Sequence, residues 1–135
     1  MSSKYGNTKL IYNDIKFDSK LECEFYICLI RAKEEGKIKD FTLKPKFILQ
    51  DKFEKHQKKY RAITYTADFT VIDNEDNVHV IDCKGVETVE FKIKKKLFLK
   101  KFDFPLHCLT HIKKYGGWIE LEEYKRKRKQ LKKKV

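Results

Sequence analysis

The sequence predicts an α/β fold in which helices flank a mixed β-sheet, with elements in the order α-β-β-β-α-β. Three observations predict it: a helical apolar pattern after residue 19, two alternating segments around a turn between residues 61 and 84, and a second helical pattern over residues 89–102. The chain has 135 residues, of which 41% are hydrophobic. This is enough apolar material for one core, so we expect a single globular domain.

The first helix is expected in the stretch DSKLECEFYICLIRAKEEG. Ser19 is suited to its N-cap and Gly36 to its C-terminal cap. Apolar residues recur there at helical spacing and define the face that we expect to be buried. The residues of that face are Leu21, Phe25, Cys28, Leu29 and Ala32.

The strands are expected in the middle of the chain. Two extended segments, IKDFTLKPKFIL and FILQDKF, lie around Pro45, which favours an edge strand or a bend. The segment RAITYTADFTVI alternates, NEDN is typical of a turn, and VHVIDCK returns as the partner strand. A second helix follows with Val89, Ile93 and Leu97 on one face, and FPLHCLT is the last strand.

The basic residues gather near the C-terminal end. The formal net charge is +12, and eight lysines and arginines lie between Lys125 and Lys134, where there is no acid. We therefore divide the chain into a domain over residues 1–118 and a basic tail over residues 119–135, which either continues as a helix or is disordered when free. Such a tail indicates a polyanionic partner, and it has few large apolar side chains for a membrane, so nucleic acid is preferred.

The four cysteines, Cys23, Cys28, Cys83 and Cys108, show no paired short spacing. No histidine lies at metal-ligand spacing from a cysteine pair, so a zinc site is not expected. No apolar stretch is long enough to span a membrane, and the sequence shows no signal peptide. We expect a cytoplasmic protein whose thiols are reduced and mostly buried.

The predicted hairpin brings charged side chains together. With the turn in NEDN, Val71 faces His79, and Asp68 then faces Asp82. Asp82 and Lys84 are two residues apart on one strand and therefore share that side of the sheet. Two opposed carboxylates repel each other, so we expect a cation between them. Lys84 is one candidate, and a divalent metal such as magnesium is a better one because it prefers carboxylate oxygens.

The first helix supplies a further acid. On a helical wheel Glu22 lies between Tyr26 and Leu29, whereas Glu24 lies on the solvated face. A carboxylate between apolar neighbours needs a partner. One interpretation is a capping box in which Glu22 accepts a hydrogen bond from the Ser19 N–H. The other is that the helix lies against the sheet and Glu22 joins the two aspartates.

Three carboxylates and a lysine match the requirements of phosphodiester hydrolysis. Carboxylates hold one or two magnesium ions, which activate water and neutralise the phosphate. A lysine beside the metal orients the attacking water or donates to the phosphate oxygens. The set therefore predicts a hydrolytic site that needs no covalent nucleophile.

The series Glu22, Asp68 and Asp82-Cys83-Lys84 resembles the PD-(D/E)XK nuclease superfamily over roughly residues 5–112. The phrases FDSKLECEFY, YTADF and VIDCKG look like a small phage-encoded, Holliday-junction-resolvase-like branch. The resemblance implies a restriction-endonuclease-like core, with Mg²⁺ held by Glu22, Asp68, Asp82 and the backbone carbonyl of Cys83. It also implies that Lys84 is the catalytic lysine and that Mn²⁺ substitutes for Mg²⁺.

The same resemblance implies an activity and a setting. It points to a DNA endonuclease that leaves 5′-phosphate and 3′-hydroxyl ends, acts as a homodimer and serves phage recombination, replication or packaging in the host cytoplasm. A chain of this length has little room for a separate sequence-reading domain, so we expect selectivity for branched DNA such as a Holliday junction. The sequence departs from the family pattern at Ala67, where proline is usual, at Asp82, where glutamate is commoner, and at Lys44, where some relatives have glutamine before the proline.

Basic residues outside this set are expected either to contact the DNA backbone or to form a solvated surface. Those assigned to DNA are Lys44, Lys92, Lys95, Lys96, Arg126 and Arg128. We expect Trp118 to be a packing anchor and His107 and His111 to be structural. The alternative to an enzyme is a catalytically inactive module of the same fold that binds nucleic acid or a protein, but the intact acid-acid-lysine set favours the enzyme.

Overall fold

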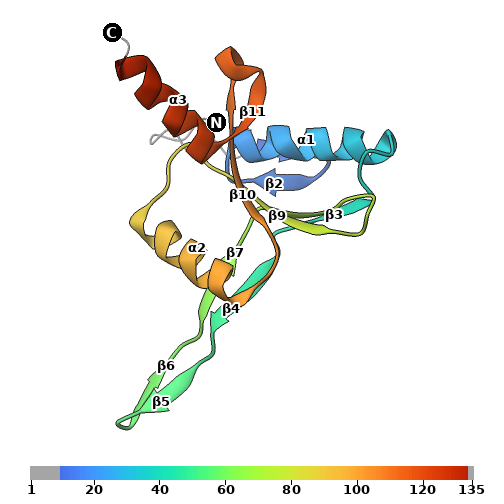
Figure 1. Cartoon of the computed structure of the whole chain (residues 1–135). Helices are drawn as coiled ribbons and strands as arrows, with labels where there is room; N and C mark the ends of the chain where they lie inside the picture. Colours follow the sequence, from blue (N-terminus) through green and yellow to red (C-terminus); the bar gives the residue numbers. More distant parts are fainter. Residues whose placement is uncertain (1–9, 134–135) are drawn as a thin grey trace.

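The computed structural model describes residues 10–133 (Figure 1). In chain order the elements are β1 (Leu10–Tyr12), β2 (Ile15–Phe17), α1 (Lys20–Glu34), β3 (Asp40–Leu43), β4 (Lys46–Gln50), β5 (Phe53–Lys55), β6 (Lys58–Tyr60), β7 (Ile63–Thr66), β8 (Phe69–Ile72), β9 (Val78–Cys83), α2 (Val89–Lys101), β10 (Leu106–Ile112), the 3-10 turn η1 (Lys113–Tyr115), β11 (Gly117–Glu120) and α3 (Leu121–Lys133). No helix in this described range is long and apolar enough to cross a membrane.

A five-stranded sheet with the order β11-β10-β9-β8-β3 forms the centre of the molecule. β10 runs parallel to β9, whereas the other neighbouring strands are antiparallel. The pairs β1–β2, β4–β7 and β5–β6 form separate two-stranded sheets. The predicted mixed α/β class is therefore confirmed, although the structure has more strands than the six-element order predicted.

Strand β9 contributes to two cores. Ile81 and Cys83 belong to the cluster that includes α1, whereas Val80 belongs to the cluster that includes Phe91 and Phe98 of α2. Side chains alternate along a strand, so Asp82 lies on the same side of the sheet as Val80. The predicted pair Asp82 and Lys84 therefore lies at the end of β9, on the side of the sheet that α2 covers.

Helix α1 has the predicted caps. The Ser19 hydroxyl accepts a hydrogen bond from the Glu22 N–H at 3.1 Å. At the other end Gly36 has a φ of +74°, and the Lys37 N–H donates to the Ala32 carbonyl at 2.8 Å. This left-handed residue after the last helical turn is the position that glycine favours.

The buried face of α1 differs from the predicted one. Its buried residues include Glu22, Cys23 and Tyr26, whereas Cys28, predicted to be buried, is exposed. The reason is that α1 is covered from two directions: Phe25 packs on Phe69 of the sheet, and Tyr26 packs on the β1–β2 hairpin. A single apolar stripe does not anticipate this second cover. The other three cysteines are buried, as expected, and all four are free thiols.

Helix α2 lies where it was predicted, but its predicted face is wrong. Val89 and Ile93 are exposed, and Phe91 and Phe98 are buried instead. The aromatic rings of β4 and β7 determine this orientation. The Phe98 ring lies 5.0 Å from that of Phe47, and the Phe91 ring lies 5.9 Å from that of Tyr65.

The C-terminal part of the chain is more ordered than a tail. The predicted boundary after residue 118 falls inside β11, which pairs with β10, and Ile119 and Leu121 are buried. From Leu121 to Lys133 the basic segment is the helix α3, because these apolar residues anchor its start to the body. Trp118 packs edge-on against Phe25, as expected of a packing anchor.

Candidate active site

The hairpin β8–β9 has the register that the sequence predicts, with Val71 opposite His79. Asp68 directly precedes β8, and its N–H donates to the Ile81 carbonyl at 3.2 Å. One oxygen of its carboxylate, Oδ2, accepts a hydrogen bond from the Cys83 N–H at 2.8 Å. These bonds hold Asp68 beside the end of β9. There burial, together with the nearby charge of Asp82, raises the pKa of the Asp68 carboxyl.

Glu22 is 2% exposed and reaches the same place from α1. Its Oε2 accepts a hydrogen bond from the Asp18 N–H at 3.1 Å, while its Oε1 is bonded to the ammonium group of Lys44. The predicted hydrogen bond from the Ser19 N–H to Glu22 is therefore replaced by one from Asp18, the residue before the N-cap. Glu22 also faces Asp68.

Asp82 is 4% exposed and is held by two neighbours. The Tyr65 hydroxyl donates a hydrogen bond to its Oδ2, and Lys84 Nζ lies 3.6 Å from its Oδ1. The Lys84 ammonium also lies 4.2 Å from the centre of the Phe91 ring, a cation–π geometry. The strand and α2 together thus fix the position of the predicted catalytic lysine.

Sequence reasoning missed the role of Tyr65, which lies in the alternating segment RAITYTADFTVI. Burial, with the added charge of Asp82, raises the pKa of the Tyr65 phenol well above its usual range. The phenol therefore stays protonated and acts as a permanent hydrogen-bond donor to Asp82. Nothing in the alternation of its strand distinguishes such a donor from an ordinary core aromatic.

Lys44 is the least expected member of the cluster. Its Nζ lies 3.6 Å from Asp68 Oδ1 and 3.5 Å from Asp18 Oδ2, in addition to its bond to Glu22. It was assigned to DNA, but its ammonium is directed among the carboxylates. Lys44 has a φ of +52° although it precedes Pro45, and its N–H donates to the Asp68 carbonyl at 2.9 Å. Left-handed backbone at a residue with a side chain is strained and recurs at functional sites.

The carboxylates are not fully neutralised. Burial raises the pKa of the Asp68 carboxyl, and the Asp82 charge raises it further, against the effect of the Cys83 N–H bond. Burial and the proximity of Asp68 likewise raise the pKa of Glu22, although Lys44 acts in the opposite direction. Raised pKa values of this kind are typical of like charges held together out of water.

These side chains lie at a cleft of about 480 Å³. Its lining includes Asp68, Asp82, Lys44 and Lys84, with Thr64 and Thr66 of β7 on one side. With Glu22 behind them, the acids at this cleft number five, whereas three lysines line it.

The donor set fits a hard cation such as magnesium. Asp68 and Asp82 each direct one carboxylate oxygen, Oδ1, toward a lysine at 3.6 Å, beyond ordinary hydrogen-bond length. Carboxylate oxygens are the ligands that Mg²⁺ prefers. Within residues 10–133, however, no three His, Cys, Asp or Glu side chains converge as a preformed metal site. The ammonium of Lys44 is bonded to Glu22 and lies 3.6 Å from Asp68 Oδ1.

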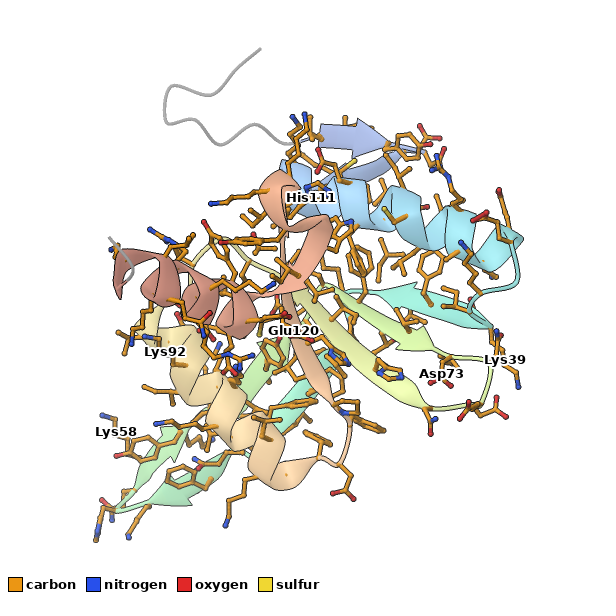
Figure 2. The ribbon with its side chains drawn as sticks, turned by 45° about the horizontal axis from the view of Figure 1, so that its top comes forward. Lys39, Lys58, Asp73, Lys92, His111 and Glu120 are labelled. Atoms are coloured by element: carbon orange, nitrogen blue, oxygen red, sulfur yellow. The ribbon has the colours of Figure 1, made fainter. Side chains whose placement is uncertain are left out.

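The residues assigned to DNA are placed differently from one another. Lys92, labelled in Figure 2, and Lys96 are exposed on α2. Arg126 is exposed on α3. Lys95 instead lies 3.1 Å from Glu122 Oε1 and 3.6 Å from Glu87 Oε2, so it links α2 to α3. Arg128 is exposed, with its guanidinium 5.5 Å from the Tyr124 ring.

The histidines lie outside the lining of the cleft. His79 is bonded to Asp73 at 2.9 Å and to His107 at 3.1 Å, and His107 is bonded to Glu120 at 2.7 Å. This series crosses the sheet from the β8–β9 turn to β11, and Figure 2 shows Asp73 and Glu120 at its two ends. It ties neighbouring strands together, in keeping with the structural role expected of His107.

Fold and cleft define an α/β protein with a mixed sheet, in which the carboxylates of Glu22, Asp68 and Asp82 lie close to the ammonium groups of Lys44 and Lys84. The chain belongs to the DUF1064 family, described as proteins of unknown function, which it matches over residues 2–117. That range includes the acids and lysines of the cleft and ends at the start of β11. No curated protein and no solved structure matches the chain.

Proposed function

We propose that this protein is a metal-dependent DNA endonuclease with a restriction-endonuclease-like core of the PD-(D/E)XK type. The observation that carries the proposal is that Asp68 and Asp82 line one cleft together with Lys84, while the buried Glu22 of α1 faces Asp68 from behind it. Burying like charges together costs free energy unless a cation joins them. An arrangement that costs stability is expected where it serves binding or chemistry.

Mg²⁺, or Mn²⁺ in its place, would be held by Asp68 and Asp82, with Glu22 and the Cys83 carbonyl as further ligands. When bound, such an ion lowers the pKa of water and offsets the charge of the phosphate. Tyr65 fixes the orientation of Asp82 by donating to its Oδ2. Lys84, held against Phe91, orients the attacking water or donates to a phosphate oxygen.

The substrate that we propose is branched DNA such as a Holliday junction, cut to 5′-phosphate and 3′-hydroxyl ends by a homodimer. A role in phage recombination, replication or packaging, in the host cytoplasm, completes the proposal. The exposed basic residues of α2 and α3, Lys92, Lys96 and Arg126, support a polyanionic substrate. The nature of the branch rests on the family resemblance.

One observation favours a second candidate function. Lys44 supplies a cation between Glu22 and Asp68, as would be expected of a nuclease fold that has become a binding module. In that case the cleft binds DNA or a protein without cutting, and divalent metal has no place in it. The two candidate functions differ in whether the protein binds magnesium and cleaves DNA in its presence.

The experiment that tests the proposal incubates supercoiled plasmid and a synthetic four-way junction with the protein in Mg²⁺, Mn²⁺ or EDTA. Asp82→Asn and Lys84→Met are each expected to lower cleavage about 10²- to 10³-fold. The matched controls are Asp76→Asn and Lys39→Met. These residues form an exposed ion pair between the β8–β9 turn and the residue before β3, and their replacement should leave cleavage unchanged. Junction binding without cutting in any metal would establish the binding module instead.

A further inference from the structure

The hairpin made by β5 and β6 projects from the body of the molecule (Figure 1). Every residue from Asp51 to Arg61, the segment that we call the arm, is exposed. The arm continues the β4–β7 pair, and among the described strands β5 and β6 pair only with each other. A two-stranded hairpin whose residues are all exposed is marginally stable by itself, so its retention needs a reason outside the core.

The charges of the arm are unfavourable for an isolated hairpin. It carries five lysines and arginines but only two acids. Lys55 lies directly opposite Lys58 in the register of the two strands. Like charges at directly opposed positions repel each other, and a polyanion beside them would remove that repulsion.

An aromatic pair lies on the same face of the arm as these two lysines. Phe53 is opposite Tyr60, and their rings stack at 4.8 Å with 13° between their planes. The two residues are 44% and 41% exposed. Residues two apart on a strand share a face, so one side of the arm presents two stacked rings beside two lysines.

The turn at the tip is also unusual. His56 and Gln57 have φ angles of +51° and +64°, a conformation that asparagine and glycine adopt most readily. The β1–β2 turn, with Asn13 and Asp14 at similar angles, follows that preference. The arm thus carries two hydrogen-bonding side chains at its tip although their backbone is strained.

We propose that the arm is a DNA-binding ribbon that enters a groove of the duplex held at the cleft, with the Phe53–Tyr60 face toward the DNA. A two-stranded ribbon fits the major groove, which is roughly 12 Å wide. Lys55 and Lys58 then contact phosphates, and His56 and Gln57 reach base edges. This inference rests on the proposed function for its geometry, because the duplex in the groove is the one that enters the cleft.

The reach of the arm sets where the contact falls. Thr64 lines the cleft, and the chain runs outward from it along β7 and β6 to Gln57. At about 3.3 Å per residue this segment spans roughly 23 Å. At about 3.4 Å per base pair, that corresponds to contacts roughly seven base pairs from the cut.

The test measures DNA affinity by fluorescence anisotropy in an Asp82→Asn background, so that no substrate is cut. The arm variant is Lys55→Gln/Lys58→Gln/Lys59→Gln, and the control, with the same charge change, is Lys33→Gln/Lys37→Gln/Lys39→Gln at the opposite end of the molecule. Figure 2 shows Lys58 and Lys39 far apart. The arm variant should bind a 30-base-pair duplex about 10- to 100-fold more weakly, with a salt slope smaller by about two to three. The control should bind nearly like its parent, and equal affinities of the two variants would overturn the inference.

A second variant tests the aromatic face without changing charge. Phe53→Leu/Tyr60→Leu should weaken duplex binding several-fold at an unchanged salt slope, and Tyr12→Leu on the β1–β2 hairpin should not. Circular dichroism and Tm should match the parent, because the arm packs on no other element. A stronger loss with a single-stranded 30-mer than with the duplex would mean base stacking on the rings, and would overturn the groove contact.

Cleavage separates this inference from the proposed function. If the chain with native Asp82 cuts DNA and the arm variants cut and bind like it, the arm inference fails and the function stands. If no metal supports cutting while the arm variants lose duplex binding, the function fails and the arm inference stands. Where both hold, the arm variants should raise KM and leave kcat nearly unchanged.

Discussion

The ammonium nitrogen of Lys44 lies 3.6 Å from Asp68 Oδ1, in the space where a divalent cation would have to bind. The same nitrogen is bonded to Glu22, so one side chain partly neutralises two of the proposed metal ligands. A metal that enters must therefore displace the lysine or share the site with it. In the first case Lys44 becomes available to the phosphate, which would restore the DNA contact expected from the sequence.

Replacing Lys44 with methionine is expected to lower stability without metal and to strengthen divalent binding. The lost ion pairs leave Glu22 and Asp68 repelling each other, and since Lys44 is partly exposed the cost is about 1 kcal/mol. Calorimetric titration should show tighter Mg²⁺ binding, and Mg²⁺ should raise Tm more than in the native chain. Lys39→Met is the control, and a Tm that ignores Mg²⁺ in both proteins would contradict the competition.

Replacing Tyr65 with phenylalanine should remove one hydrogen bond and little volume. Asp82 is buried, so its Oδ2 loses its donor without gaining water, and the free energy of unfolding should fall by about 1–3 kcal/mol. Cleavage should also fall, because Asp82 is no longer held in one orientation. Urea unfolding measures the first effect. Tyr60→Phe in the arm is the control, and an equal change in both proteins would mean that the hydroxyl of Tyr65 has no special role.

The two acids at the start of α1 should behave differently. Glu22→Gln removes a buried carboxylate that faces Asp68 and should lower cleavage about 10²-fold or more. Glu24, which is more exposed and has only a 4.0 Å contact with Lys20, should tolerate the same change. Equal losses in single-turnover cleavage would show that the helix start, and not the carboxylate position, is what matters.

Glu87 gives a prediction for pH. Burial favours a higher pKa, but the bonds to Lys125 and Lys95 outweigh it and hold the pKa of Glu87 below its usual range. A lowered pKa in the folded state stabilises the protein above the ordinary carboxylate pKa, and this contribution is lost as the pH falls below it. The difference in the free energy of unfolding between the native chain and Glu87→Gln, about 1 kcal/mol at pH 7, should therefore shrink as the pH falls below about 4. The same comparison with Glu90→Gln should show little difference at any pH.

Local patterns predicted the parts of the site that depend on local structure. The NEDN turn determines which residues of β8 and β9 are opposite each other, so the approach of Asp68 to Asp82 follows from the sequence. The caps of α1 are also local, because a Ser19 hydroxyl and a glycine after the last turn act within their own helix. What could not be predicted depends on tertiary contacts. The exposed face of α1 depends on the β1–β2 hairpin, which covers this helix in addition to the sheet. The exposed face of α2 depends on the aromatic rings of β4 and β7.

The direction of the Lys44 side chain and the exposure of the arm also could not be predicted from the sequence. The inward direction of Lys44 follows from its left-handed backbone and its bond to the Asp68 carbonyl, and neither is visible in a lysine that precedes a proline. The predicted extended segment FILQDKF ends at Phe53, so neither the β5–β6 hairpin nor its exposure was anticipated. Tyr65 likewise looks like a core aromatic until its hydroxyl is placed beside Asp82.

The position of Lys44 has a consequence for how the chain reaches its native state. Many small metal-binding domains stay unfolded until the ion arrives, because the site does not exist in the unfolded chain and the free energy of binding drives folding. Here the ammonium of Lys44 already lies among the carboxylates. The strands beside Asp68 and Asp82 can therefore fold before any metal ion binds. The proposed magnesium ion would then bind to a protein that is already folded, and it would be required for cleavage but not for folding.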